Sequence, residues 1–140
     1  MIKVVLDTNL VISAALSREG NPAKIFEMLL LGYMKNYTTQ EIINEIKEVM
    51  ERPKITKHLN KQDRFFMLTH FENNSEKIKS TTHIKVVDKD PADDKFINCA
   101  LTAKADYIIS GDNHLLKLKT YENMRIINPA TFLQIIKDCT

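Results

Sequence analysis

Short apolar runs alternate with longer stretches of helical periodicity along the chain. Residues 2–6 are rich in β-branched side chains, which predicts a buried strand that ends at Asp7. The longer stretches carry apolar residues three and four positions apart, as helices with one buried face do. Further extended runs are expected at 33–37, 84–87, 107–109 and 125–127. This alternation predicts an α/β protein with a parallel sheet and helices on both of its faces.

Capping residues and prolines mark where the predicted helices begin. Between these helices, residues 73–82 are polar and rich in turn formers, and residues 54–61 are typical of a basic connecting segment. The predicted helix starts are Asn21 with Pro22, Thr38 with Glu41, Asn60, Asp90 with Pro91, and Asn128 with Pro129.

The size and composition of the chain fit a single globular domain over residues 1–140. Of the 140 residues, 44% are apolar and 27% charged, and the formal net charge of +2 argues neither for nor against a nucleic-acid partner. No apolar run is long enough to span a bilayer, and no basic leader with a cleavage site is seen, so no membrane association is expected. Cys99 and Cys139 have neither metal-site nor redox spacing, which predicts a reduced, cytoplasmic protein.

Four acidic residues fall where the predicted strands leave the sheet. Asp7 and Asp112 each follow a strand directly, and Asp94 begins the helix after another extended run. Glu45 lies in the early turns of a helix, roughly 100° from the centre of its apolar stripe, at the border between core and solvent. With right-handed crossovers, all four positions lie at the carboxyl edge of the sheet, where open α/β proteins bind their ligands.

Each of these acids also has a purely structural interpretation. Asp7 is as consistent with a helix cap as with a functional site, and the helix dipole can stabilise acids near Asp94. Glu45 can be a solvated residue that pairs with Lys47 or Lys54. The shared edge favours a common site, because unrelated acids would scatter over both edges of the sheet.

Several carboxylates at close range repel one another unless they are protonated or bind a cation. Oxygen ligands favour Mg²⁺ or Mn²⁺, and no cluster of His or Cys points to zinc. Such an ion orients a phosphodiester, lowers the pKa of a bound water and neutralises the leaving oxygen, which indicates phosphodiester hydrolysis. Asn9, Ser13 and Ser110 are candidates to hold the ligand carboxylates or the phosphate.

The motifs of the chain resemble those of the PIN-domain family, of the kind found in VapC-like toxins of bacterial and archaeal toxin–antitoxin pairs. The similarity runs from Ile2 to about Phe132, in the family's motif order. The matching stretches are Val5-Leu6-Asp7-Thr8-Asn9 with Ser13, Glu45 followed by residues 49–54, Asp90-Pro91-Ala92-Asp93-Asp94-Lys95-Phe96, and Ile109-Ser110-Gly111-Asp112.

This resemblance implies a three-layer α/β/α sandwich with a central, mainly parallel sheet of four or five strands. It implies a ribonuclease that depends on Mg²⁺ or Mn²⁺, with Asp7, Glu45, Asp94 and Asp112 as its catalytic and metal-binding acids. It also implies a homodimer and a cognate antitoxin that occludes the site. One departure is His114, which stands where many relatives carry another acid; a neutral His can still bind a metal or a phosphate, but one negative charge is lost.

Two other functions stay open at the level of the sequence. A haloacid-dehalogenase-like phosphatase would use Asp7 as its nucleophile, although such enzymes usually carry a second Asp where this chain has Asn9. A non-catalytic RNA-binding or assembly module could use the same fold. The four acids argue against such a module, since binding RNA requires no negative cluster. The candidates for contacts with RNA phosphates are Lys54, Lys57 and Lys61.

Overall fold

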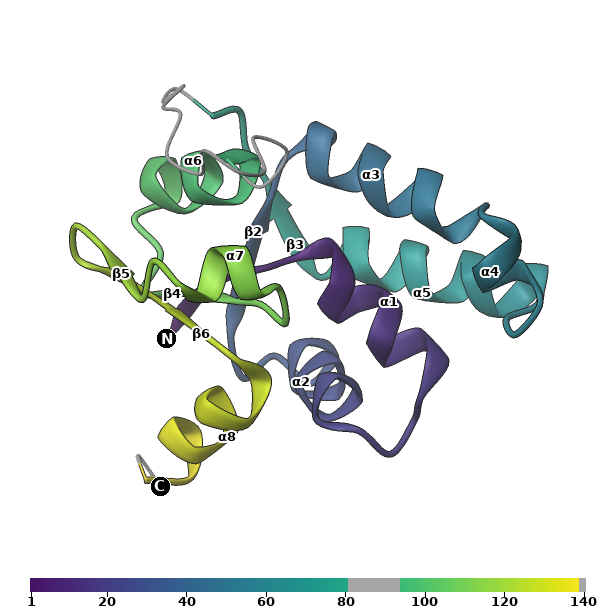
Figure 1. The fold of residues 1–140 in the computed structure, drawn as a ribbon, viewed down its shortest axis with the longest axis horizontal. Helices are drawn as coiled ribbons and strands as arrows, with labels where there is room; N and C mark the ends of the chain where they lie inside the picture. The colour runs from purple at the N-terminus through teal and green to yellow at the C-terminus, as the bar shows by residue number, and fades with distance from the viewer. Residues whose placement is uncertain (81–93, 139–140) are drawn as a thin grey trace.

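One sheet of six strands runs through the computed structural model, which describes residues 1–80 and 94–138 (Figure 1). Its strands stand in the order β3-β2-β1-β4-β6-β5, and every pair is parallel except β5 with β6. The predicted central, mainly parallel sheet is confirmed, with six strands instead of four or five. The strands are β1 (Lys3–Leu6), β2 (Lys35–Thr38), β3 (Ser75–Lys77), β4 (Tyr107–Ile109), β5 (Thr120–Tyr121) and β6 (Met124–Ile127).

Helices lie on both sides of these strands, as the alternation of elements predicts. One side is covered by α6, which packs on β1, β2 and β4, and the other by α1, α2 and α8 (Figure 1). Within the described residues, no helix has both the length and the apolar character needed to cross a membrane. The helices are α1 (Thr8–Leu16), α2 (Asn21–Leu30), α3 (Gln40–Met50), α4 (Pro53–Thr56), α5 (Lys61–Asn73), α6 (Asp94–Ala103), α7 (Asn113–Leu116) and α8 (Pro129–Asp138).

The strand β1 is buried from both faces at the centre of the sheet. Val4 and Val5 are fully buried and Leu6 nearly so, as expected of a parallel strand covered by helices on each side. Because β1 pairs with β4, the chain leaves both strands at the same edge of the sheet. The Asp7 N–H donates to the Ile109 carbonyl at 3.2 Å and continues this pairing one residue beyond β1.

Two strands and one helix are missing from the sequence-based prediction. The strand β3 lies within residues 73–82, where turn formers predict a loop, and β5 has only two residues. Both are short strands at the edges of the sheet, where the side chains are little buried. Their sequences therefore show little of the alternation of apolar and polar residues that indicates a strand. The one-turn helix α4 lies largely within the predicted connection 54–61. The predicted strand at 84–87 and the predicted helix start at Asp90 lie outside the described residues.

The predicted helix caps are confirmed for α5 and α8, where the Asn60 and Asn128 side chains each accept a backbone N–H at 2.8 Å. The predicted caps Thr38 and Asn21 are wrong by one residue. Thr38 still belongs to β2, and Asn21 is already the first residue of α2. The residue that caps α3 is Thr39, which accepts a backbone N–H in the first turn.

A buried asparagine ties three strands together below the carboxyl edge of the sheet. Asn36 on β2 is fully buried, and its Oδ1 accepts the Leu6 N–H of β1 at 3.0 Å. Its Nδ2 donates to Ser75 Oγ of β3 at 2.8 Å, and Ser75 Oγ in turn donates to the Phe71 carbonyl of α5 at 2.6 Å. This bridge holds the last residue of β1, and therefore the start of the following segment, in register.

We expect Asn36→Ala to destabilise the protein by about 2 kcal/mol, because the substitution leaves the buried Leu6 N–H without its acceptor. Urea denaturation followed by circular dichroism measures this change. The matched control is Asn44→Ala on the exposed face of α3, which should change the free energy of unfolding by less than about 0.5 kcal/mol. An equal, small effect in both variants would contradict the role given to Asn36.

Candidate functional site

The carboxyl ends of β1 and β4 bring Asp7 and Ser110 together. Asp7 directly follows β1 and is 2% exposed, and Ser110 directly follows β4 and is fully buried. The Ser110 hydroxyl donates to Asp7 Oδ2 at 2.5 Å. Asp7 Oδ1 accepts the Leu10 N–H at 2.8 Å and so caps α1. Asp7 is therefore both a helix cap and part of a buried polar cluster at the predicted edge.

Asp112 joins this cluster through Ser110. Its backbone N–H donates to Ser110 Oγ at 2.9 Å, and its Oδ1 accepts the His114 N–H at 2.7 Å, which caps α7. The Asp112 side chain is 20% exposed and the His114 side chain 45% exposed, with 3.9 Å between His114 Nδ1 and Asp112 Oδ1. His114 thus lies on the solvent side of a chain of contacts that runs from Asp7 through Ser110 to Asp112.

Burial raises the pKa of Asp7 from 3.8 to about 6. The hydrogen bonds from the Ser110 hydroxyl and the Leu10 N–H lower this pKa, whereas the nearby charge of Asp112 raises it further. The loss of hydration outweighs the hydrogen bonds. Ionised Asp7 therefore costs free energy at neutral pH, and a cation beside it would offset that cost.

Glu45 pairs with a buried lysine that has no role in the sequence-based prediction. Lys95 lies in the first turn of α6, its side chain is 7% exposed, and its Nζ contacts Glu45 Oε2. The Glu45 side chain is 30% exposed, which confirms its predicted place at the border between core and solvent. The alternative pairing with Lys47 is wrong, because Lys47 reaches Glu72 at 3.9 Å instead. The contact between α3 and α6 is tertiary, so no local pattern indicates it.

The other predicted site residues include Asp94 on α6 and Asn9 and Ser13 on α1. Asp94 is the first residue of α6 and is 7% exposed. Asn9 and Ser13 lie on α1 beyond Asp7, and both are exposed. Hydrogen bonds link Asp7 with Ser110 and Asp112, which we call the aspartate cluster, and an ion pair links Glu45 with Lys95.

The family model of the PIN domain matches residues 3–114 of the chain. The chain belongs to the PIN-domain family. PIN domains are generally nucleases, so the aspartate cluster lies in a family of hydrolases. An uncharacterized protein of Methanocaldococcus jannaschii is 38% identical over 128 residues, which cover 91% of this chain and 81% of that protein.

The same fold is found in the crystal structure of VapBC2 from Rickettsia felis bound to a DNA fragment from its promoter. The TM-score is 0.59 over 91% of this chain and 98% of that chain, at 14% sequence identity. The predicted PIN-like α/β/α fold is confirmed by this similarity and by the six-stranded sheet.

The donor atoms of this PIN domain suit a hard divalent cation in their chemistry. Asp7, Asp94, Asp112 and Glu45 offer carboxylate oxygens, which are the ligands that such an ion prefers. Among residues 1–80 and 94–138, however, no three His, Cys, Asp or Glu side chains are gathered closely enough to hold a metal ion. The residues therefore fit Mg²⁺ or Mn²⁺ by type, and in this structure the Glu45 carboxylate contacts the Lys95 ammonium group.

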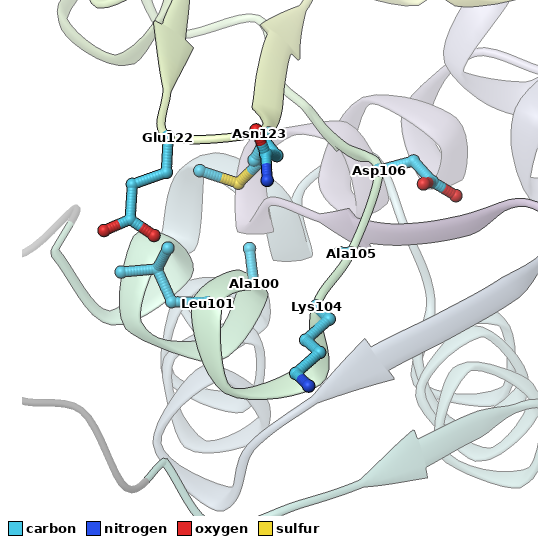
Figure 2. Close-up of a pocket in the computed structure, with 8 residues that line it drawn as sticks. Ala100, Leu101, Lys104, Ala105, Asp106, Glu122 and Asn123 are labelled. Carbon is cyan, nitrogen blue, oxygen red and sulfur yellow. The ribbon is translucent and has the colours of Figure 1, made fainter.

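A separate hollow of about 510 Å³ lies at the opposite, amino edge of the sheet (Figure 2). One of the residues that line it is Asp106, which precedes β4 and accepts the Lys3 N–H at 3.0 Å, and so fixes the start of β1. The side chains around this hollow are not those that the motifs single out, so we place the site of this PIN domain at the carboxyl edge. The hollow is lined by Ala100, Leu101, Lys104, Ala105, Asp106, Glu122, Asn123 and Met124.

Proposed function

We propose that this PIN domain is a ribonuclease that depends on Mg²⁺ or Mn²⁺ and cuts RNA at the carboxyl edge of its sheet. The observation that carries the proposal is Asp7, a buried carboxylate at the end of β1 whose pKa is raised to about 6 and which Ser110 links to Asp112. A buried acid with a perturbed pKa beside a second acid is typical of a functional site.

Asp7, Glu45, Asp94 and Asp112 are the residues proposed to hold the ion. When bound, the ion would lower the pKa of a water molecule and neutralise the leaving oxygen of the phosphodiester. Ser110 fixes the Asp7 carboxylate by its short hydrogen bond, and the Leu10 N–H fixes the other oxygen. These two bonds orient Asp7 before any ligand arrives, which lowers the entropic cost of binding.

The exposed polar residues around the cluster are proposed to contact the RNA. Asn9 and Ser13 lie on the first turns of α1, and His114 lies in the first turn of α7. Farther away, on and after α4, the exposed side chains of Lys54, Lys57 and Lys61 can meet phosphates by charge attraction.

Asn9 weighs against the phosphatase alternative. It occupies the position where such enzymes usually carry a second Asp, and it is exposed on α1.

The proposal is tested by incubating labelled RNA and DNA strands of identical sequence with the protein in Mg²⁺, in Mn²⁺ and in EDTA. We expect cleavage of RNA in either metal, none in EDTA, and little or no cleavage of the DNA strands. Binding of RNA without cleavage by a folded, metal-loaded protein would instead support the non-catalytic module.

We expect Ser110→Ala to weaken Mn²⁺ binding by about 10- to 100-fold, the usual effect of removing a group that orients a metal ligand. Without the hydroxyl, Asp7 Oδ2 loses its donor and the Asp112 N–H loses its acceptor. Isothermal titration with Mn²⁺ measures the change. Ser17→Ala, at the exposed end of α1, should bind like wild type; equal affinities for all three proteins would contradict the positioning role of Ser110.

We further propose that the protein is the toxin of a toxin–antitoxin pair and forms a homodimer. The structural similarity to VapBC2 supports this assignment through the fold alone. Phe65 and Phe66 of α5 are 71% and 52% exposed, and large exposed aromatic residues are typical of surfaces that meet a protein partner. Light scattering of the purified chain should therefore give the mass of two chains, and the mass of one chain would contradict the homodimer.

A further inference from the structure

A hollow of about 500 Å³ lies at the carboxyl end of α1, between that helix and α5. We call it the α1–α5 hollow. Its wall is largely apolar, with Ala14 and Leu16 from α1 and Phe66 and Met67 from α5. Its volume falls within the range of pockets that bind a small molecule or one group of a larger ligand, about 300–1,000 Å³.

Charged side chains of both signs line the same hollow. Arg18 follows α1, His58 follows α4, and Asp63 lies in the first turn of α5. Among residues 1–80 and 94–138, the side chains of these three residues make no hydrogen bond or ion pair. Two donors and one acceptor are therefore left for a ligand beside an apolar wall, which is the usual make-up of a binding pocket.

Phe66 gives the hollow an aromatic surface that is held in place. Phe66 is 52% exposed, and its ring centroid lies 4.1 Å from that of His70, one turn further along α5. Phe65 lines a separate apolar hollow beside α3 and stays available for a contact with a protein. Stacking on aromatic side chains is a common way in which proteins hold the bases of single-stranded RNA.

The helix α1 connects the α1–α5 hollow to the aspartate cluster. Asp7 caps the amino end of α1, and Leu16 ends the helix at the wall of the hollow. At about 1.5 Å per residue, the nine residues of α1 separate the two places by about 13 Å, or about two to four nucleotides of a stacked strand. Asn9, Ser13 and Leu16 are exposed and stand four and three positions apart, so they form one stripe between the two places.

We infer that the α1–α5 hollow binds one base of the RNA, a few nucleotides from the cut, and that this base is guanine. Only guanine among the four RNA bases presents two adjacent N–H donors, N1–H and N2–H, which one carboxylate such as Asp63 accepts together. Another edge of guanine presents the acceptors O6 and N7, to which arginine donates, and Arg18 is placed to do so. This inference rests on the proposal that RNA is the substrate and names the feature of the RNA that is selected.

The test measures the affinity for single-stranded RNA by fluorescence anisotropy, in EDTA so that cleavage does not compete. The probes are labelled uridine oligonucleotides of about ten residues, one of uridine only and three with a single central guanine, adenine or cytosine. Wild type should bind the guanine oligonucleotide about tenfold more tightly than each of the others, as expected for one base held by paired hydrogen bonds.

Two variants separate hydrogen bonding from stacking. Asp63→Asn should lose most of the preference for guanine, and Asp138→Asn, which removes an exposed charge from the end of α8, should keep it. Phe66→Ala should bind every oligonucleotide about tenfold more weakly, because stacking on an aromatic ring tolerates any base. Its control is Tyr33→Ala, which removes another exposed aromatic ring, at a residue 64% exposed after α2, and should bind like wild type.

Circular dichroism and light scattering first establish the fold and the number of chains of each variant, and Asp63→Asn alone decides if Phe66→Ala is unfolded. Equal affinities of wild type for the four oligonucleotides, or variants that bind them like wild type, would overturn the inference while RNA cleavage in Mn²⁺ leaves the nuclease intact. The inference also falls if Phe66→Ala changes only the number of chains, since the hollow would then belong to a protein contact. A preference for guanine without cleavage in Mg²⁺ or Mn²⁺ would instead overturn the proposed nuclease.

Discussion

Asp7→Asn is expected to reduce metal-dependent RNA cleavage by about 10²- to 10³-fold, the usual cost of removing one group that stabilises charge at a reacting centre. Asparagine keeps the size of the side chain and can still accept the Leu10 N–H, so α1 keeps its cap. What the variant loses is the negative charge at the end of β1. The measurement is the initial rate of cleavage of a labelled RNA in saturating Mn²⁺.

The control for this variant is Asp138→Asn, which removes the same charge from the exposed end of α8. Its cleavage rate should equal that of wild type. If Asp7→Asn is folded and cuts RNA within a few-fold of the wild-type rate, Asp7 is a helix cap only and the proposed site is wrong.

The second large effect concerns the stability of the metal-free protein. The pKa of Asp7 is raised from 3.8 to about 6 on folding, so the folded state binds a proton at this residue more tightly than the unfolded state. The free energy of unfolding therefore contains a contribution that is fully present below pH 4 and is lost as the pH rises to 6. Above that pH, burial of ionised Asp7 costs about 3 kcal/mol.

This cost is isolated by comparing wild type with Asp7→Asn in EDTA, because all other titrating groups are common to both proteins. Urea denaturation between pH 4 and pH 7 should show the variant gaining roughly 2 to 3 kcal/mol of stability relative to wild type. Saturating Mn²⁺ at pH 7 should reduce this gain by stabilising wild type alone. A stability difference that stays constant with pH would show that Asp7 ionises without a burial penalty.

The part of the site that the sequence predicts is the part set by strand ends. Asp7 follows a short run of β-branched residues, and Ser110 and Asp112 follow another. Parallel pairing of β1 with β4 then brings these positions to one edge, whatever the details of packing. The caps Asn60 and Asn128 are predictable for a similar reason, since a cap depends on residues within one helical turn.

What the sequence does not predict depends on tertiary contacts. The pair of Glu45 with Lys95 joins α3 to α6 across 50 residues of chain, and nothing near either residue indicates it. The strand β3 is likewise held by the Asn36 side chain and its backbone pairing with β2, and not by apolar residues of its own. Thr38 illustrates the opposite error, because a sequence match to a capping box is overridden when pairing with β3 extends β2 through that residue.

Anomalous diffraction from crystals soaked in Mn²⁺ tests most directly whether the carboxyl edge of this PIN domain is a metal site. The expected result is a Mn²⁺ peak within coordinating distance of an Asp7 carboxylate oxygen. A peak in the hollow near Asp106 and Glu122, or no peak beside Asp7 at saturating Mn²⁺, would contradict a metal-dependent nuclease site built on Asp7.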